Sequence, residues 1–164
     1  MQNYDDEVVT GIHDLLERGR PHIQAQLRRY QPDLSPFTIF PGRKVPLSPL
    51  PAIEIVRASP TLEQDWFATT VYGSKLNYFL DCSIQSTKET FGEKLASVFG
   101  KIIVKWLNHM PNKVFLIPNS NATNWDSQAT GYDANYRRGA GLRTARVVYW
   151  VKVLEPAITS FFDP

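Results

Sequence analysis

A long amphipathic helix between Ser86 and Met110 is the strongest pattern in this sequence. Apolar residues recur there at steps of three and four, which puts them on one helical face at about 100° per residue. Ser86 and Glu89 have the spacing of a capping box, and Pro111 ends the helix because proline cannot continue a helix interior. The pattern predicts a helix that lies on a sheet. Its apolar residues are Phe91, Leu95, Val98, Phe99, Ile102, Ile103, Trp106, Leu107 and Met110.

Residues 1–30 have a second helical pattern. Apolar stripes cover residues 8–16 and, more loosely, residues 23–30. Gly19 and Pro21 lie between the two stripes, and proline suits the first turn of a new helix. We therefore expect two helical pieces, with Pro21 at the beginning of the second.

A proline-rich connection, residues 31–51, follows the helical segment. A short strand at residues 37–40 is flanked by prolines, which confines it to the edge of a sheet. The run 45–51 is typical of an extended, polyproline-like chain. A stiff connection over the surface is favoured here over a ligand for a proline-binding groove.

The first strands of the predicted sheet come next. Residues 76–84 alternate apolar and polar side chains with period two, as expected of a strand with one buried face. Residues 52–57 predict a shorter strand with Ile53 and Ile55 on one face. Residues 62–70 have the composition of a polar connection between these two strands.

The remaining strands are expected after the long helix. Residues 114–117 form a brief apolar run closed by Pro118, and residues 143–154 form a longer strand. The centre of this last strand, residues 147–151, is entirely apolar or aromatic. We therefore expect it inside the sheet with both faces covered.

Together these elements predict an α+β fold. It has an antiparallel or mixed sheet of about four to five strands, a long helix packed on one face, and an N-terminal helix. The length of 164 residues suits a single domain, 1–164. Its parts are the helical segment 1–30, the proline-rich connection 31–51, the sheet and central helix 52–155 with a long loop 119–142, and a tail 156–164.

The composition argues against several classes of protein. A net charge of +2 is too small to indicate a nucleic-acid partner, and the single cysteine, Cys82, leaves no internal disulfide or cysteine-based zinc site. No apolar run approaches the roughly 20 residues of a membrane span, and the acidic N-terminus is unlike a signal peptide. We therefore expect a chain that stays in a cytoplasm and has no membrane partner.

Charge is nevertheless segregated along the chain. Residues 1–17 carry five acids and no base, whereas residues 18–44 carry six bases and one acid. Solvated helix faces explain this segregation more simply than a binding patch does.

Candidate catalytic residues are scarce. Nucleophilic catalysis needs a Ser or Cys beside a His that a carboxylate orients. The three histidines, His13, His22 and His109, have no such partners at a recognisable spacing, nor the spacing of metal ligands. Cys82 falls on the buried face of its strand, as a small hydrophobe. We expect no enzyme activity, no catalytic residue, no metal site and no cofactor.

Residues 119–142 have no apolar periodicity, and we expect them to form a loop that contacts another molecule. A compact domain seldom keeps a loop of more than about twenty residues without such a role. Tyrosine and arginine, which are enriched at protein interfaces, crowd into this loop and the start of the next strand. A long hairpin folded back on its own sheet is the alternative. The candidate interface residues are Trp125, Tyr132, Tyr136, Arg137, Arg138, Arg143 and Arg146.

The same mixture of residues also suits single-stranded nucleic acid. However, residues 118–146 carry four bases and two acids, a small surplus of positive charge. This balance favours a protein interface.

Several elements follow one another in a distinctive order along residues 5–155. They are an N-terminal helix, a strand near Ile53, the Tyr78–Asp81 strand, a long helix ending in Trp106-Leu107, and, after a polar loop, the strand Val147–Val153. This order resembles that of the tail-terminator or tail-completion proteins of tailed bacteriophages and related contractile particles. The resemblance lies in the order of elements rather than in one diagnostic motif.

The resemblance implies a small virion subunit without catalytic residues. Such subunits form a ring, usually hexameric, at the top of the tail, where the ring caps the tail tube and joins it to the head–neck connector. The implied partners are further copies of the chain, the tail tube or sheath protein below, and a connector or stopper protein above. DNA is only a passing cargo. The implied location is the tail or neck of a virion assembled in the host cytoplasm.

Two alternatives stay open from the sequence. One is another neck, tail or head-completion structural protein. The other is a basic accessory module that binds nucleic acid. Beyond these two, a small enzyme is the least favoured interpretation.

Overall fold

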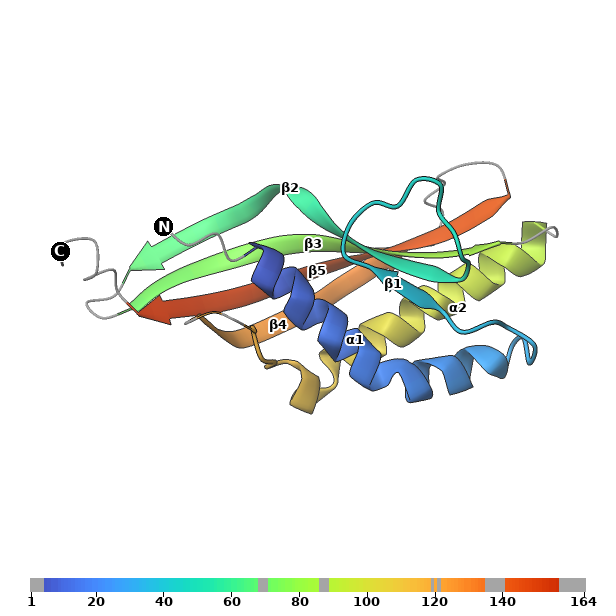
Figure 1. Cartoon of the computed structure of the whole chain (residues 1–164), viewed down its shortest axis with the longest axis horizontal. Coiled ribbons are helices and arrows are strands. Elements are labelled where there is room, and N and C mark those ends of the chain that lie inside the picture. The colour runs from blue at the N-terminus through green and yellow to red at the C-terminus, as the bar shows by residue number, and fades with distance from the viewer. Residues whose placement is uncertain are drawn as a thin grey trace.

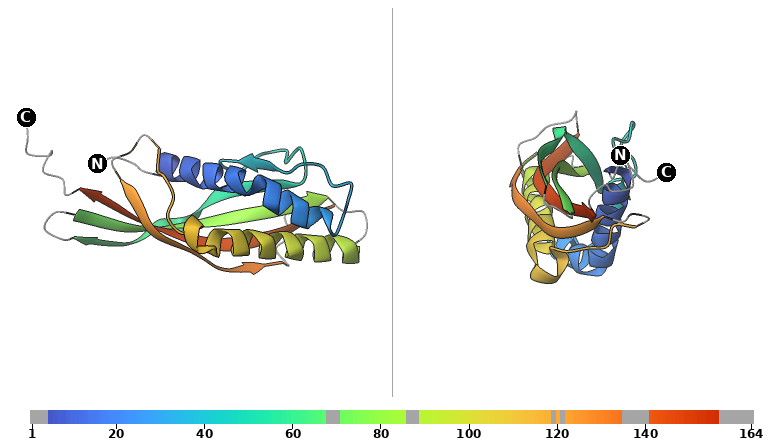
Figure 2. Two further views of the ribbon diagram at one scale, coloured as in Figure 1. Left: turned by 90° about the horizontal axis from the view of Figure 1, so that it is seen from below. Right: turned by 90° about the vertical axis from the view of Figure 1, so that its left-hand side faces the viewer.

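The computed structural model describes residues 5–67, 71–85, 89–118, 120, 122–134 and 141–156 of the chain. These residues form one five-stranded sheet with two long helices packed on one of its faces (Figures 1 and 2). The predicted α+β class is confirmed, and so is the long helix on one face of a mixed sheet.

The elements follow one another along the chain as α1 (Asp5–Arg28), β1 (Thr38–Phe40), β2 (Ala52–Phe67), β3 (Val71–Gln85), α2 (Glu89–Asn108), the short 3-10 helix η1 (Met110–Asn112), β4 (Thr123–Asp133) and β5 (Leu142–Pro156). The strand order in the sheet is β1-β2-β3-β5-β4. β1 runs parallel to β2, and every other neighbouring pair is antiparallel. β1 therefore lies at an edge, as its flanking prolines predicted.

The helix α2 supplies the centre of the core. Leu95, Phe99, Ile103 and Leu107 are buried on the side of α2 that faces the sheet. Gly100 allows the close approach, because a Cβ there would lie 2.9 Å from the Cβ of Ala145 on β5. The predicted capping residue Ser86 lies outside the described residues.

The helix α1 is a single helix, so the expectation of two separate pieces is wrong. Pro21 lies inside it, and Figure 1 shows that the helix bends along its length. Proline has no N–H to donate to the carbonyl of Glu17, which accounts for a bend without a break. Gly19 lets the indole of Trp106 from α2 lie against α1, and Trp106 Nε1 donates to the carbonyl of Leu15 at 3.1 Å.

The strand β2 is longer than the sequence predicted. Residues 62–67 continue the strand that begins at Ala52, in place of the expected polar connection. They pair with β3, with register irregularities between Arg57 and Gln64. Pairing with a long antiparallel neighbour therefore overrides the polar composition of this segment.

One end of the sheet projects beyond the helices. Figure 1 shows β2, β3 and β5 continuing past the beginning of α1. The pairs there include Trp66 with Gly73 and Lys75 with Lys152. The chain is therefore elongated along its strands.

The described part of residues 119–142 is largely a strand rather than the expected loop, as in the long-hairpin alternative, and its contact with another molecule stays a prediction. Residues Thr123–Asp133 form β4, which pairs antiparallel with β5. Its buried positions are Asn124, Ser127 and Ala129, so apolar residues alone do not carry the pattern of this strand. Two register irregularities, next to Asn124 and Ala129, further obscure the pattern.

Hydrogen bonds satisfy these buried polar side chains. The amide of Asn124 accepts from the N–H of Phe115 at 3.0 Å and donates to the carbonyl of Lys152 at 3.1 Å. Ser127 donates to the carbonyl of Lys113 at 2.8 Å. The segment that leads from η1 to β4 is therefore held against the strand through side chains.

That segment corrects a further expectation. Residues 114–117 were expected to form a strand, but they are not part of the sheet. Phe115 and Ile117 are buried, and Leu116 points outward. A Cβ at Gly11 would lie 2.8 Å from the carbonyl of Leu116, so this extended segment packs on α1 instead.

The side chain of Asn108 closes part of the outer edge of β4. It donates to the carbonyl of Ala129 and accepts from the N–H of the same residue, both at 2.8 Å. The amide thus takes the place of a neighbouring strand, which protects an edge that could otherwise pair with another chain.

The strand β5 lies inside the sheet, but only one of its faces is fully covered. Val147 and Tyr149 are buried under the helices, whereas Val148 between them is 40% exposed. The expectation that both faces are covered is therefore wrong. The helices of the described chain lie on one side only, so apolar residues on the other side remain accessible.

Replacing Leu95 by Ala should lower the free energy of unfolding by about 2–5 kcal/mol, because it leaves a cavity between α2 and the sheet. Lys101→Ala, on the exposed side of the same helix, is the matched control and should change it by less than about 0.5 kcal/mol. Urea unfolding of both variants measures the difference. Equal midpoints for Leu95→Ala and the wild type would show that α2 is not the centre of the core.

Candidate functional site

The face of the sheet opposite α1 and α2 is the candidate site, and we call it the open face. Alternation along the strands assigns each residue to one side: Tyr78 and Leu80 of β3 lie under the helices, and Phe79 between them lies on the open face. Figure 2 shows both helices on the other side of the sheet. The side chains on the open face include those of Val56, Lys75, Phe79, Trp125, Arg146, Val148, Trp150 and Lys152.

Aromatic rings and cations alternate across the open face. The Nζ atom of Lys75 lies 5.4 Å from the ring centroid of Trp150, and that of Lys152 lies 5.1 Å from the same ring. Lys152 also lies 5.0 Å from the ring of Trp125, which is 42% exposed. These contacts span β3, β5 and β4, and each contributes roughly 0.5–1 kcal/mol at an exposed site. We call these four residues the aromatic–cation row.

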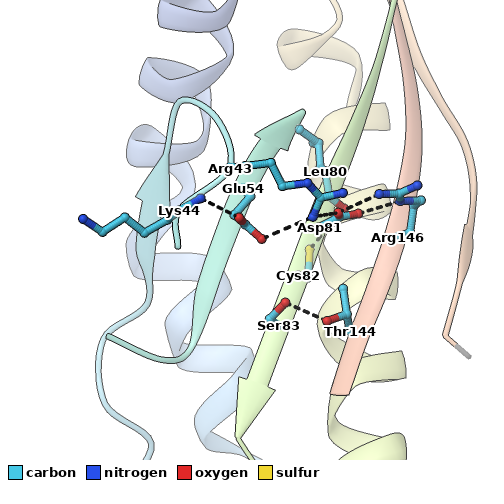
Figure 3. Close-up of polar contacts among 9 residues, drawn as sticks. All are labelled: Arg43, Lys44, Glu54, Leu80, Asp81, Cys82, Ser83, Thr144 and Arg146. Atoms are coloured by element: carbon cyan, nitrogen blue, oxygen red, sulfur yellow. Dashed lines mark hydrogen bonds and ion pairs between the residues drawn. The ribbon is translucent and has the colours of Figure 1, made fainter. Parts of the chain in front are cut away.

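A buried ion network lies on the same side of the sheet, six residues along β3 from Lys75. The carboxylate of Asp81 has no exposed surface and accepts two bonds from the guanidinium of Arg146, at 2.8 and 2.9 Å. Nη1 of Arg43 lies 3.0 Å from the same carboxylate and 3.8 Å from that of Glu54. Glu54, also fully buried, accepts from the backbone N–H of Lys44 at 2.9 Å (Figure 3).

The network fixes the proline-rich connection over one end of the open face. Arg43 and Lys44 come from that connection, whereas Glu54, Asp81 and Arg146 come from three neighbouring strands. A buried carboxylate without such partners would be strongly unfavourable. The guanidinium of Arg146 also lies over the ring of Phe79, so the network and the aromatic–cation row lie on the same side of the sheet.

Two of the candidate interface residues from the sequence lie on the open face. Trp125 belongs to the aromatic–cation row. Arg146 is half-buried, pairs with Asp81, and lies 4.3 Å from the ring centroid of Phe79. The structure therefore brings these two residues onto one surface, although Arg146 already has a partner within the chain.

The other candidates are not on this face. Tyr132 packs on α2, where a Cβ at Gly100 would lie 3.1 Å from its ring, and its hydroxyl is 3.4 Å from Oγ of Ser97. Arg143 is half-buried and has the strand parity of the helix-covered residue Ala145. The remaining candidates lie outside the described residues; they are Tyr136, Arg137 and Arg138.

Sequence reasoning missed Lys75, Trp150 and Lys152. The alternation along each strand could have indicated them. Lys75 falls on the same side of its strand as the polar positions of residues 76–84, and Trp150 and Lys152 fall on the same side as Arg146. The register that brings Lys75 beside Lys152 depends on the pairing of two strands that are far apart in the sequence, and the sequence alone does not reveal this pairing.

The residues that could do covalent chemistry are not grouped. Within the described ranges, no cluster of three or more His, Cys, Asp or Glu residues could hold a metal ion. Burial raises the pKa of the Cys82 thiol well above its usual value, and the neighbouring Asp81 raises it further, so this thiol is a poor nucleophile. Its predicted position on the buried face is confirmed. The expectation of no enzyme activity stays a prediction.

A hollow between the two helices contains two of the histidines. Its volume is about 320 Å³, and His22 stacks on Trp106 there at 5.9 Å between ring centroids, with His109 near by. None of the described residues that line it carries a carboxylate. Among the described lining residues, the histidines therefore have no carboxylate partner that would make one of them a general base.

Neither α1 nor α2, as far as the structure describes them, is long and apolar enough to cross a membrane.

Comparison with known proteins finds similarity in structure but not in sequence. No protein-family model and no curated protein matches this sequence. A chain from a solved structure described as the virion of a native gene transfer agent (GTA) particle is similar in structure, with a TM-score of 0.52 and 12% sequence identity. The match covers 89% of this chain and 93% of that chain. The two chains therefore share a fold along most of their lengths.

Replacing Asp81 by Asn should lower the free energy of unfolding by roughly 3–5 kcal/mol, because the largely buried guanidinium of Arg146 then faces a neutral amide, although Arg43 keeps the carboxylate of Glu54 at 3.8 Å. Asp33→Asn, at an exposed position, is the control and should have little effect. Urea unfolding distinguishes them. If both variants unfold at the same urea concentration, the network does not hold the proline-rich connection in place.

Proposed function

We propose that this chain is a structural protein of a tailed-phage-like virion. The observation that carries the proposal is the structural likeness to a chain of the gene transfer agent virion, which extends over 89% of this chain and 93% of that one. Near-complete coverage of both chains supports the proposal, because the likeness extends over the whole fold rather than over one shared motif.

Within the virion, we assign the chain to the tail terminator. The order of a helix, two long strands, a long helix and a late apolar strand is the order on which the resemblance to tail terminators rests. In this role, copies of the chain form a ring, usually of six, that caps the tail tube and meets the head–neck connector. The ring lies at the top of the tail, and DNA passes through it as cargo.

The surface chemistry supports a subunit rather than an enzyme. The open face combines exposed Trp125 and Val148 with half-buried Trp150, and tryptophan is among the residues enriched where proteins meet. A ring subunit needs two such surfaces on different sides, because each copy contacts two neighbours.

Binding of single-stranded nucleic acid is the second candidate. The aromatic–cation row favours it, since bases stack on aromatic rings and phosphates pair with lysines. Against it, the nearby cations Arg43 and Arg146 already face the buried carboxylate of Asp81, which leaves less positive charge for phosphates.

Deletion of the gene tests the assignment. Without a tail terminator, electron micrographs should show DNA-filled heads separate from tails of irregular length, and the wild-type gene supplied in trans should restore complete particles. Complete, infectious particles in the deletion strain would contradict a virion role. Heads that fail to retain DNA, with tails of normal length, would instead place the chain at the head.

A further inference from the structure

We propose that the open face receives the acidic side of α1 from a second copy of this chain. The proposal rests on the virion function above, because a ring requires a contact between copies, but it names the two surfaces and is tested separately.

The open face has the composition of a protein contact. Val148, in the middle of a central strand, is 40% exposed, and Val56 and Phe79 beside it are only partly covered. No helix of the described chain lies above them (Figure 2). Exposed apolar side chains on a continuous surface, rimmed by polar groups, mark an interaction site.

The same face favours a negatively charged partner. Lys75 and Lys152 extend over the tryptophan rings, so positive charge lies directly above apolar surface. Two acidic residues of β4 share this side: Asp126, which is 3.8 Å from Lys113, and Asp133, which is the register partner of Arg146 and lies farther from the lysines. The carboxylates of Glu54 and Asp81 are fully buried and face arginines.

The α1 helix carries the complementary surface. Asp6 and Asp14 have 86% and 62% of their side chains exposed, and the exposed Thr10 lies between them at a spacing of four residues. This spacing places all three on one side of the helix. Asp6 also pairs with Arg57, and Asp14 lies 3.4 Å from His13, but both carboxylates remain open to solvent.

The two surfaces have matching lengths. Eight residues of helix separate Asp6 from Asp14, about 12 Å at 1.5 Å per residue. The aromatic–cation row spans β3, β5 and β4, roughly 10 Å at about 4.8 Å between neighbouring strands. Lys75 lies at one end of the row and Trp125 at the other, with Lys152 and Trp150 of β5 between them, so the helix can lie across all three strands.

The position of the two surfaces determines the type of assembly. The α1 helix and the open face lie on opposite sides of the sheet (Figure 2), so each copy can offer its α1 to one neighbour and its open face to another. Such a heterologous contact closes into a ring when its rotation permits. A twofold contact between two open faces would instead bring like charges together.

Charge exchange between the two surfaces tests the inference. Lys152→Glu and Asp14→Lys should each raise the chain concentration needed for half-assembly at least about tenfold, measured by light scattering on the purified full chain. An equal mixture of the two variants should assemble again, because each repels its own copies but attracts the other. Lys101→Glu, on the exposed side of α2, is the control and should assemble as the wild type does.

Several outcomes overturn the inference. They are a monomeric wild type, unchanged assembly of both variants, and no recovery in the mixture. If Lys152→Glu fails to fold, judged by urea unfolding, Lys75→Glu replaces it. A further outcome concerns nucleic acid. If the wild type binds a fluorescent oligothymidylate, and Lys152→Glu does not bind it but assembles normally, the open face binds nucleic acid instead.

The gene deletion remains an independent test of function. If the deletion strain makes no complete particles but the charge-exchange experiment fails, only the proposed contact between copies is overturned. If the charge-exchange variants behave as expected but the deletion strain still makes complete particles, only the proposed virion role is overturned.

Discussion

The sheet of this chain is covered by helices on one face only, and this asymmetry determines the environment of its strand residues. On the covered side, Tyr78, Leu80 and Tyr149 have no exposed surface and pack under α1 and α2. On the open side, each side chain must form an ion pair, pack on a neighbouring ring or contact a partner. The alternation of β3 and β5 places adjacent residues in these two environments.

On the open side, the buried carboxylates of Asp81 and Glu54 need the most compensation by surrounding groups. Neither has exposed surface, and each is stable only because cations and N–H groups surround it. The arginine that serves both comes from the proline-rich connection. The network therefore explains why a segment with little regular structure lies firmly across three strands, and why the open face is accessible only beyond it.

The sequence predicted those parts of the fold in which apolar residues carry the pattern. The α2 helix and the strand β3 have such patterns, and both were correct. The strand β4 was missed because Asn124 and Ser127 occupy buried positions through hydrogen bonds, which hydropathy does not reveal. The second half of β2 was missed because its pairing with β3, rather than its composition, makes it a strand.

The candidate surface was predictable only in part. Composition identified Trp125 and Arg146, since tryptophan and arginine are typical of interfaces. It did not identify Lys75 and Trp150, whose proximity depends on the register between β3 and β5. It also grouped Tyr132 with Trp125, although the two lie on opposite faces of the sheet. Proximity along the chain is a poor guide to a shared face when the chain is a strand.

The most direct test of the central claim is a cryo-electron microscopy reconstruction of intact particles that contain this chain. We expect a closed ring of copies at the top of the tail, with Trp125, Val148 and Trp150 of each copy covered by the first half of the neighbour's α1. A chain located elsewhere in the particle, or a ring in which these residues face solvent, would contradict this account.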